Sequence, residues 1–395
     1  MATMAHANDA VERGRYLAIL GDCQGCHTAP HQPAFSGGLP FTAAFGTLYS
    51  TNITPDRETG IGAWSKDDFY RALHQGIAPG GKHLYPAFPY VYFTRLSRRD
   101  TDDLFAWLKT LKPVRRSPTP NALYFPFNIR AVMTVWNWLY LDSTPYRRDP
   151  KQSAAWNRGR FIVEGPGHCA ACHTPKDILF GDRKNQAFTG ATVQNWFAAN
   201  LTGSSPDGLA SWSHDELVRY LATGRGIHAT AAGAMEEKVS LSTSRMTAAD
   251  RDAIATYLKS LPPKAQMPVP APPAGQMAAG EAAFVARCSF CHQPPGRADQ
   301  PAPGRPADYP KLAGDTLVLG RDPTTVVRII LQGAQAPTTP DGKTTFAMPG
   351  FPVLSDTQIA DVATYIRNAW GNRAPAVSAR AVGALRHAIA VTPGY

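Results

Sequence analysis

The six cysteines constrain this chain more than any other feature of its sequence. They occur in three copies of the pattern Cys-x-x-Cys-His, at residues 23–27, 169–173 and 288–292, and no cysteine lies outside these copies. Two thiols at this spacing can form thioethers with the two vinyl groups of haem, and the adjacent histidine can bind the iron. A thioredoxin-like dithiol or half of a zinc site would not require a histidine after the second cysteine every time.

The pattern therefore predicts three covalently attached haem c groups. The predicted attachment pairs are Cys23 and Cys26, Cys169 and Cys172, and Cys288 and Cys291, and the predicted proximal iron ligands are His27, His173 and His292. Such attachment takes place after export, and residues 1–13 contain no apolar run of signal-peptide length. We therefore expect a mature chain whose leader has been removed. We expect no membrane-spanning helix, because no apolar stretch reaches about 20 residues.

Repeated helix signals organise the chain into three similar parts. A glycine and a short helix-like run precede each motif, starting at Gly14, Gly159 and Gly280. The next helix begins with Ser65–Asp68, Ser213–Glu216 or Asp322–Pro323, and the closing helix begins with Ser97–Asp100, Thr247–Asp250 or Ser355–Gln358. Most of these pairs are capping boxes, which mark helix N-termini. The expected fold is mainly α, with three helices around each haem.

These signals predict the boundaries of three domains. The first domain is 1–113, the second is 151–262 and the third is 279–371, separated by an aromatic linker (114–150) and a Pro-rich linker (263–278). We expect the aromatic linker to pack between the first two domains or against a partner subunit, with membrane contact as the alternative. The tail, 372–395, has apolar residues spaced for one helix face and could lie on a membrane surface.

A methionine in the loop before the closing helix is the expected sixth iron ligand of two haems. Met235 and Met348 follow the first cysteine of their motifs by 66 and 60 residues. A methionine sulfur at this position raises the reduction potential of a haem. Met246 is a rival to Met235, but it directly precedes the cap of the closing helix and is expected to act as a hydrophobic staple.

The first copy has Phe88 where the others have methionine, 65 residues after Cys23. Because phenylalanine cannot bind iron, another side chain must reach the first haem, or its sixth position stays open or takes water. We expect His83 as the ligand. His74 and Met133 are the other candidates, and a surface or propionate-bonding role is the alternative for His83.

Several other residues are expected to support the haems. Asn52 and Asn200 occupy matching places after their motifs and could bind propionates or simply form turns. Trp64 and Trp212 are expected in the core, covering haem edges. Prolines follow each proximal histidine, at Pro30, Pro175 and Pro294, where a backbone carbonyl could orient the imidazole.

The formal net charge of +10 is compatible with nucleic acid, anionic lipid or an acidic partner. The sequence contains no aromatic-studded basic helix, no zinc-finger spacing and no long Lys/Arg run, which argues against nucleic acid. Haem propionates would offset part of the charge. The remaining mildly basic surface suits an acidic partner or anionic lipid.

Taken together, the segments GRFIVEGPGHCAACHTP (from Gly159) and AMPGFPVLSDTQIADVATYIRNAWGN (from Ala347) resemble the triple-haem cytochrome c subunits of membrane-bound bacterial dehydrogenases. The resemblance covers nearly all of residues 11–372. It implies three tandem cytochrome c-type domains and axial ligation by the three proximal histidines, Met235 and Met348. It also implies transfer of electrons from a catalytic subunit to ubiquinone, at the periplasmic face of the cytoplasmic membrane.

The first loop also indicates a branch of that family. In the alcohol, gluconate and fructose dehydrogenase branches this loop resembles PAMPY, whereas here residues 86–90 read PAFPY. The change is similar to the branch that serves molybdopterin hydroxylases such as aldehyde dehydrogenase, which implies an iron–sulfur subunit as a further partner. The leading prediction is thus an electron-transfer subunit without a catalytic residue. Alternatives are the cytochrome subunit of a PQQ- or flavin-dependent alcohol or sugar dehydrogenase, a haem enzyme with an open first haem, and a free soluble shuttle.

Overall fold

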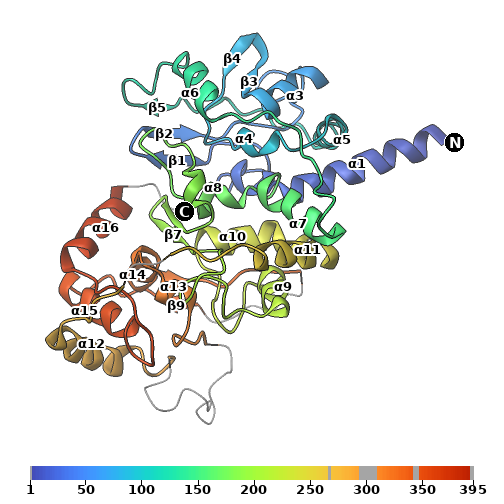
Figure 1. The fold of residues 1–395 in the computed structure, drawn as a ribbon. Coiled ribbons are helices and arrows are strands. Elements are labelled where there is room, and N and C mark those ends of the chain that lie inside the picture. Colours follow the sequence, from blue (N-terminus) through green and yellow to red (C-terminus); the bar gives the residue numbers. More distant parts are fainter. Residues whose placement is uncertain (1, 266–267, 293–308, 341–346, 392–395) are drawn as a thin grey trace. The chain divides into compact units, whose positions relative to one another are not determined.

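The computed structural model describes residues 2–265, 268–292, 309–340 and 347–391, and the predicted mainly α fold is confirmed (Figure 1). The chain divides into two compact units. Unit 1 comprises Met1–Ala171, Lys176–Asp182 and Leu241–Ile254, and unit 2 comprises Cys172–Pro175, Arg183–Ser240 and Ala255–Tyr395. Within the described residues, no helix is both long and apolar enough to cross a membrane.

Unit 1 holds the first motif and the aromatic linker. Its helices are α1 (Ala2–Leu20), α2 (Cys23–Cys26), α3 (Lys66–Gln75), η1 (Pro79–Gly81), α4 (Tyr90–Phe93), α5 (Arg98–Leu108), α6 (Val132–Tyr140), α7 (Ala154–Glu164) and η3 (Thr243–Arg245). Strands β1 (Pro40–Ala43), β2 (Gly46–Tyr49) and β5 (Ala122–Leu123) form one antiparallel sheet, and β3 (Ile77–Ala78) pairs with β4 (Lys82–His83).

Unit 2 holds the third motif and most of the second predicted domain. Its helices are η2 (Lys184–Gln186), α9 (His214–Thr223), α12 (Ala274–Arg287), α13 (Thr316–Leu319), α14 (Thr324–Gln332), α15 (Asp356–Ile366) and α16 (Ala379–Val391). Strand β6 (Ala191–Val193) pairs with β7 (Trp196–Ala198), and β8 (Gly333–Ala334) pairs with β9 (Met348–Pro349). Helices α8 (Cys169–His173), α10 (Ala234–Leu241) and α11 (Ala248–Lys259) contain residues of both units.

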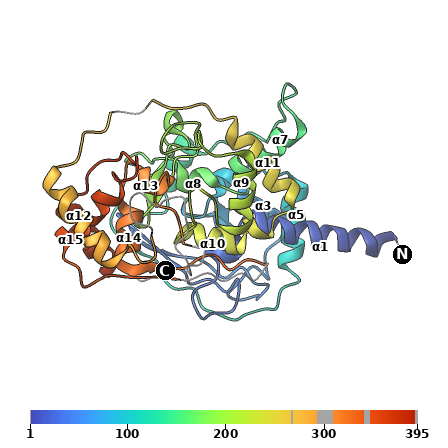
Figure 2. The same cartoon turned by 90° about the horizontal axis from the view of Figure 1, so that it is seen from below.

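The glycine that opens the repeat lies where its helix crosses the closing helix. A Cβ atom on Gly14 of α1 would lie 2.0 Å from the carbonyl oxygen of Asp103 in α5. A Cβ atom on Gly280 of α12 would lie 2.2 Å from the carbonyl oxygen of Asp361 in α15. Figure 2 shows α12 and α15 together with α14. Only glycine allows the two backbones to approach so closely, which explains why the residue recurs.

The predicted helix caps form where the sequence places them. Capping boxes join Ser65 to Asp68, Ser97 to Asp100 and Ser355 to Gln358, with both hydrogen bonds present in each pair. Ser213 accepts a hydrogen bond from the Glu216 backbone N–H. The Glu216 carboxylate accepts from the His228 backbone N–H, so the second bond of a capping box is not formed. Helix α14 begins at Thr324, whose N–H donates to Asp322.

The two-unit division differs from the three predicted domains at the start of the second domain. Asp250 accepts hydrogen bonds from Tyr16 of α1 at 2.6 Å and from Arg158 of α7 at 2.7 and 2.8 Å. The Ser242 hydroxyl donates to the Ile19 carbonyl at 2.6 Å. These bonds tie α7 and the start of α11 to α1, so both belong to unit 1. The boundaries of the three haem domains remain predictions.

The tail forms a helix, but its apolar face is not available to a membrane. Val382 and Leu385 of α16 are buried in the third-motif core with Ile359, Val362 and neighbouring residues, and Ile389 packs against that core. Arg386 pairs with Asp356 and donates to the Pro352 and Leu354 carbonyls. The suggestion of a membrane-surface helix is therefore corrected, because the third domain covers the face on which it depended.

Candidate haem-binding sites

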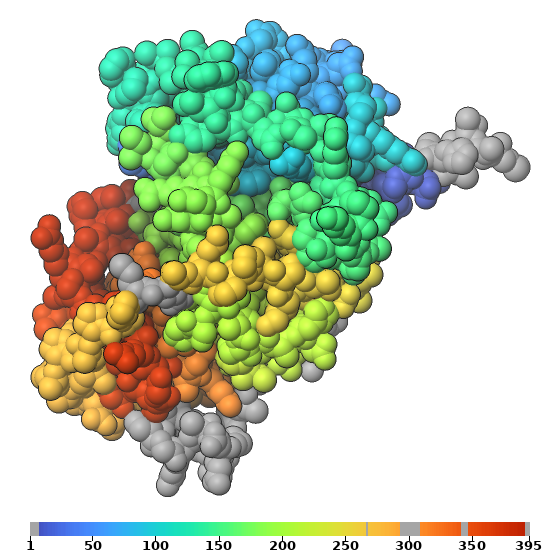
Figure 3. Space-filling view, viewed as in Figure 1, coloured from blue at the N-terminus to red at the C-terminus, as the bar shows by residue number. Residues whose placement is uncertain are grey.

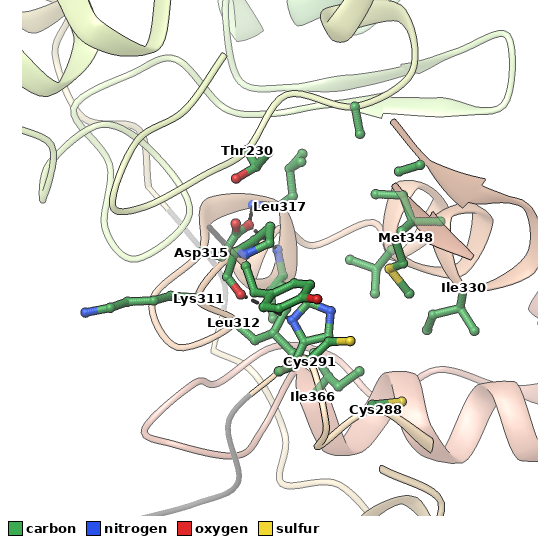
Figure 4. Close-up of a pocket in the computed structure, with 18 of the residues that line it drawn as sticks. Thr230, Cys288, Cys291, Lys311, Leu312, Asp315, Leu317, Ile330, Met348 and Ile366 are labelled. Atoms are coloured by element: carbon green, nitrogen blue, oxygen red, sulfur yellow. Dashed lines mark hydrogen bonds between the residues drawn. The ribbon is translucent and has the colours of Figure 1, made fainter. Parts of the chain in front are cut away.

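A cavity of about 530 Å³ surrounds the third motif. Cys288, Cys291, His292 and Met348 all line it, and Figure 4 shows the two cysteines and the methionine around one space. Most of the remaining lining is aliphatic, from Val326, Ile330, Leu354, Val362 and Ile366. A volume of this size lies within the ~300–1,000 Å³ of cofactor and ligand pockets. Two thiols, one imidazole and one thioether around an apolar cavity fit covalently bound haem c.

Each proximal histidine is held in the tautomer that can bind iron. Nδ1 of His27 lies 2.6 Å from the Thr51 carbonyl, Nδ1 of His173 lies 2.6 Å from the Ala199 carbonyl, and Nδ1 of His292 lies 3.2 Å from the Pro310 carbonyl. A carbonyl oxygen only accepts, so Nδ1 carries the proton and the Nε2 lone pair is left for a metal.

Burial keeps these three imidazoles neutral. It lowers the pKa of His27, His173 and His292, while the hydrogen bond to the carbonyl opposes that shift. A metal-binding imidazole must be neutral, since protonation of Nε2 removes the lone pair. Burial at the three motifs therefore favours the neutral imidazole of each histidine, which is the form that can bind iron.

The orienting carbonyls of Thr51 and Ala199 do not come from the segments that begin at Pro30 and Pro175, so the prediction built on these two prolines is wrong. Pro294 lies outside the described residues. Two of the carbonyls belong to the residues just before Asn52 and Asn200. Sequence reasoning missed Thr51 and Ala199, although the paired asparagines marked the right place in both repeats.

Asn52 and Asn200 are buried, and hydrogen bonds hold both amides within their loops. The Asn52 Oδ1 accepts from the backbone N–H and hydroxyl of Thr54, and its Nδ2 donates to Thr59 and to the Val114 carbonyl. The Asn200 Oδ1 accepts from the backbone N–H and hydroxyl of Thr202 in the same way. These turns fix the carbonyl that precedes each asparagine, and propionate binding by either residue stays a prediction.

The second loop places Met235 in the first turn of α10, half-buried. Gly233 just before it has a positive φ of 56°, and a Cβ there would lie 2.4 Å from the Trp196 ring. The loop can therefore pass the indole only with glycine at this position. Met246 is buried at the end of η3, as expected for a staple residue. Ligation by Met235 stays a prediction.

The two tryptophans differ in burial. Trp212 is buried, stacks edge-on against Tyr220 and lies beside His228. Its indole Nε1 is buried and has no hydrogen-bond partner among the described residues. A buried donor without an acceptor is costly, and a haem carboxylate would satisfy it. Trp64 is only half-buried, and a role for it at the first haem stays a prediction.

Phe88 packs into an aromatic cluster instead of presenting a ligand. Its ring centroid lies 5.6 Å from that of Phe93 and 6.3 Å from that of Tyr90. Tyr90 is fully buried with Met133 and Trp136 of α6, and Phe88 packs against this group. Met133, one candidate for the first iron, thus lies in the core formed by the linker helix.

His83 and His74 have different surroundings. His83, in β4, has Nε2 3.1 Å from the Thr134 hydroxyl of α6, while its Nδ1 is buried without a partner among the described residues. His74 Nε2 lies 3.3 Å from the Thr101 hydroxyl, which itself donates to the Ser97 carbonyl, so Nε2 of His74 must donate. Burial lowers the pKa of His74 to about 4. His83 remains the predicted ligand of the first haem.

A loop of the second predicted domain forms one wall of the third cavity. Residues 225–227 and 230–232 line it beside the third motif. The buried Glu216 carboxylate accepts from the His228 backbone N–H at 2.8 Å and lies 2.9 Å from His228 Nδ1. The His228 carbonyl in turn accepts from the Thr316 backbone N–H at 2.8 Å. This chain of bonds fixes the loop against α13, and the capping-box interpretation of Glu216 did not foresee it.

A buried carboxyl group also lines this cavity. Asp315 caps α13 by accepting from the Leu317 and Val318 backbone N–H groups at 2.8 and 3.2 Å. Burial raises its pKa to about 7, against the opposing effect of the two backbone hydrogen bonds. Asp315 was not identified from the sequence.

Comparison with known proteins matches this architecture to a family. The cytochrome c family model matches residues 158–262 and 277–370. The chain is 38% identical to the gluconate 2-dehydrogenase cytochrome c subunit of Pantoea cypripedii, over 96% of this chain and 90% of the relative. This chain belongs to the cytochrome c subunits of bacterial dehydrogenases. Cytochrome c domains bind haem c covalently, in agreement with the attachment cysteines.

Two further relatives of this cytochrome c subunit differ in length. The cytochrome c subunit of alcohol dehydrogenase (quinone) from Gluconobacter oxydans is 36% identical, over 97% of this chain and 84% of the relative. One of the nicotinate dehydrogenase subunits of Pseudomonas putida is 40% identical over 93% of this chain. The chain spans only 31% of the length of that nicotinate dehydrogenase subunit.

Proposed function

We propose that this chain is the triple-haem electron-transfer subunit of a periplasm-facing, membrane-associated dehydrogenase. It passes electrons from a catalytic subunit to ubiquinone. The observation that carries the proposal is the third cavity, where both motif cysteines, a neutral histidine and a methionine line one apolar space. The motif and the carbonyl-held histidine recur at all three positions, which supports three haems.

Haem iron exchanges one electron reversibly between its ferric and ferrous states. The chain's own residues provide what this requires. Carbonyl-held histidines keep Nε2 ready as a ligand, and aliphatic side chains form most of the lining of the third cavity. Met348 places a thioether on the cavity wall, and thioether ligation favours the reduced iron and a high potential.

The proposed catalytic partner is a molybdopterin-dependent aldehyde dehydrogenase with an iron–sulfur subunit. Phe88 in place of the loop methionine supports this branch, and the relative with 40% identity is a nicotinate dehydrogenase subunit. A PQQ- or flavin-dependent alcohol or sugar dehydrogenase is the second candidate. It is supported by the alcohol and gluconate dehydrogenase subunits, which match this chain over 84% and 90% of their own lengths.

The haem count tests the first part of the proposal. The pyridine haemochrome assay on the purified chain should give three haems per polypeptide. Replacing both cysteines of a single motif by serine should lower the count by one for each of the three motifs. A count of two in the wild type, unchanged by one of the double substitutions, would refute the triple-haem assignment.

Identification of the catalytic partner and of the electron acceptor requires the intact complex. The chain should be tagged in its own bacterium and purified from membranes with its subunits, followed by assays for molybdenum, flavin and PQQ. Molybdenum without PQQ supports the hydroxylase partner. PQQ or flavin without molybdenum supports the second candidate. Aldehyde-dependent reduction of a water-soluble ubiquinone should be lost when the third motif is removed, and unaffected reduction would contradict the proposed route.

A further inference from the structure

The aromatic linker, together with Ile178 from the second predicted domain, exposes a large apolar surface in unit 1. Phe125, Trp138 and Ile178 expose 78%, 82% and 88% of their surface, and Tyr124, Val135 and Leu139 expose about half to two thirds. We call these six residues the aromatic patch. An aromatic side chain presents ~150–250 Å², so the patch exposes on the order of 700 Å² of apolar surface. The largest apolar patch on a typical monomer is only ~300–600 Å².

The three segments that carry the patch are fixed to one another. Trp136 of α6 donates its indole N–H to the Leu179 carbonyl at 2.8 Å, and the Tyr140 hydroxyl donates to Asp177 at 2.7 Å. The ring of Phe127 lies 5.9 Å from that of Phe180. The region around α6 lies at the upper left of Figure 3. These contacts therefore hold the segments that carry the exposed side chains in fixed positions relative to one another.

The inner face of α6 explains why the outer face stays exposed. Met133 and Trp136 are buried against Tyr90, so the helix is already anchored to the first domain. Val135, Trp138 and Leu139 on the other side are not needed for that packing. In α16, by contrast, the apolar face is buried in the core of the third predicted domain. An apolar helix face left in water after folding indicates an interaction surface.

The charges around the patch indicate its partner. Between residues 117 and 141 Arg130 is the only charged residue, and the segment contains no acid. Exposed basic residues lie on both sides of it in sequence, namely Lys112 and Arg115 before it and Arg147 and Arg148 after it, and Arg115 pairs with Glu58. Exposed Trp, Tyr and Phe between basic flanks are the composition of segments that lie at a membrane–water interface. The basic flanks are complementary to anionic headgroups.

We propose that the aromatic patch docks this subunit on the surface of an anionic phospholipid bilayer. Phe125, Trp138 and Ile178 insert at the headgroup level, and the basic flanks bind anionic lipid. The inference deepens the proposed function and rests on it, because ubiquinone is reached through a bilayer. The patch would hold the first domain at that surface.

Flotation with lipid vesicles tests this proposal on the purified haem-loaded chain. Vesicles of phosphatidylcholine alone are compared with vesicles that also contain phosphatidylglycerol, at low and high salt. We expect binding to the anionic vesicles that weakens with salt. The triple variant Phe125→Ser, Trp138→Ser, Ile178→Ser should bind about tenfold more weakly or worse, because it loses three inserted apolar side chains. The haem spectra of the variant report whether it is folded.

The control variant carries Val285→Ser and Val391→Ser, which remove exposed aliphatic residues of unit 2, 55% and 65% exposed. It should bind vesicles like the wild type. Equal binding by the folded triple variant, or no vesicle binding by the wild type, overturns the proposal. Loss of the co-purifying catalytic subunit with vesicle binding intact also overturns it and assigns the patch to a protein partner. The haem count and substrate-driven haem reduction are measured separately, so failure here is distinguishable from failure of the proposed function.

Discussion

The loops before the closing helices of the third and the first repeat carry different residues at one matching position, Met348 and Phe88, and these residues pack in different ways. In the third repeat Met348 lines a cavity together with its motif, whereas in the first repeat Phe88 packs into an aromatic cluster completed by α6. The proximal side is the same in both, because each histidine donates Nδ1–H to a backbone carbonyl. The difference shows that the residue at this loop position can change from lining the cavity to packing against an aromatic cluster while the histidine side is retained. Four predictions test this contrast.

The largest effect is expected from making the third loop like the first. Met348→Phe should lower the reduction potential of one haem by about 100 mV or more, since axial ligands set haem potentials over about 0.8 V. Optical redox titration measures this change. Met277→Leu, at a partly buried position of the same domain core, should leave the potentials unchanged. Unchanged potentials in Met348→Phe would show that Met348 is not a ligand.

His83→Ala tests what replaces methionine at the first haem. We expect a bis-histidine signal in low-temperature EPR of the oxidised protein to disappear, because alanine cannot bind iron. The exposed His31→Ala serves as the control. A high-spin signal that persists unchanged in His83→Ala would leave the first iron open beside Phe88. Carbon monoxide should then bind to the reduced wild type.

Asp315 makes the stability of the third site depend on pH. Its pKa is about 7 in the folded chain against the usual 3.8, so the folded state holds a proton that the unfolded state has lost between these values. Stability should therefore fall by up to about 4 kcal/mol as pH rises from about 4 to about 7. Asp315→Asn keeps a good helix cap and cannot titrate.

Thermal unfolding of wild type and Asp315→Asn at several pH values measures this slope. The variant should be the more stable protein at pH 8 and should lose most of the pH dependence in the acid range. The phenol of Tyr220 interacts with Asp315, but burial raises its pKa far above this range, so it does not contribute. Parallel pH profiles for the two proteins would contradict the assignment to Asp315.

The smallest effect is expected from loosening the wall of the third cavity. Glu216→Gln should destabilise the chain by about 1–2 kcal/mol, because one charged acceptor of His228 is lost. The potential of the third haem should shift by less than in Met348→Phe, and the first haem should not respond. Asp215→Asn, a fully exposed neighbour on α9, is the matched control. An equal shift of both potentials would show that the loop does not act specifically on the third site.

Local signals in the sequence predicted a large part of this structure. Ser97 with Asp100 and Ser355 with Gln358 start the closing helices because a capping box needs only residues three positions apart. The cysteine motifs and their histidines needed no tertiary information. Gly14 and Gly280 were visible as repeats, although their role as crossing points could be read only from the packed helices.

Features that depend on distant segments could not be predicted in the same way. Thr51 and Pro310 serve through their backbone carbonyls, which have the same chemistry in every residue type and therefore carry no sequence signal. The Glu216 carboxylate bonds to His228 because a loop folds back on α9, whereas its spacing from Ser213 indicated a cap. The sequence has apolar residues on both faces of α6 and on one face of α16, and only packing leaves the outer face of α6 exposed while it buries the face of α16.

The sequence by itself thus determined the predicted chemistry of this protein: which thiols are expected to attach haem, which imidazoles are expected to bind iron, and where a methionine is present or missing. Short-range covalent and hydrogen-bonding rules suffice for these features. The tertiary structure decided which carbonyl orients each histidine, which loop closes the third cavity, and which apolar surface remains in contact with solvent. Those outcomes depend on long-range packing, which buries one of two similar surfaces according to what the rest of the fold places against it.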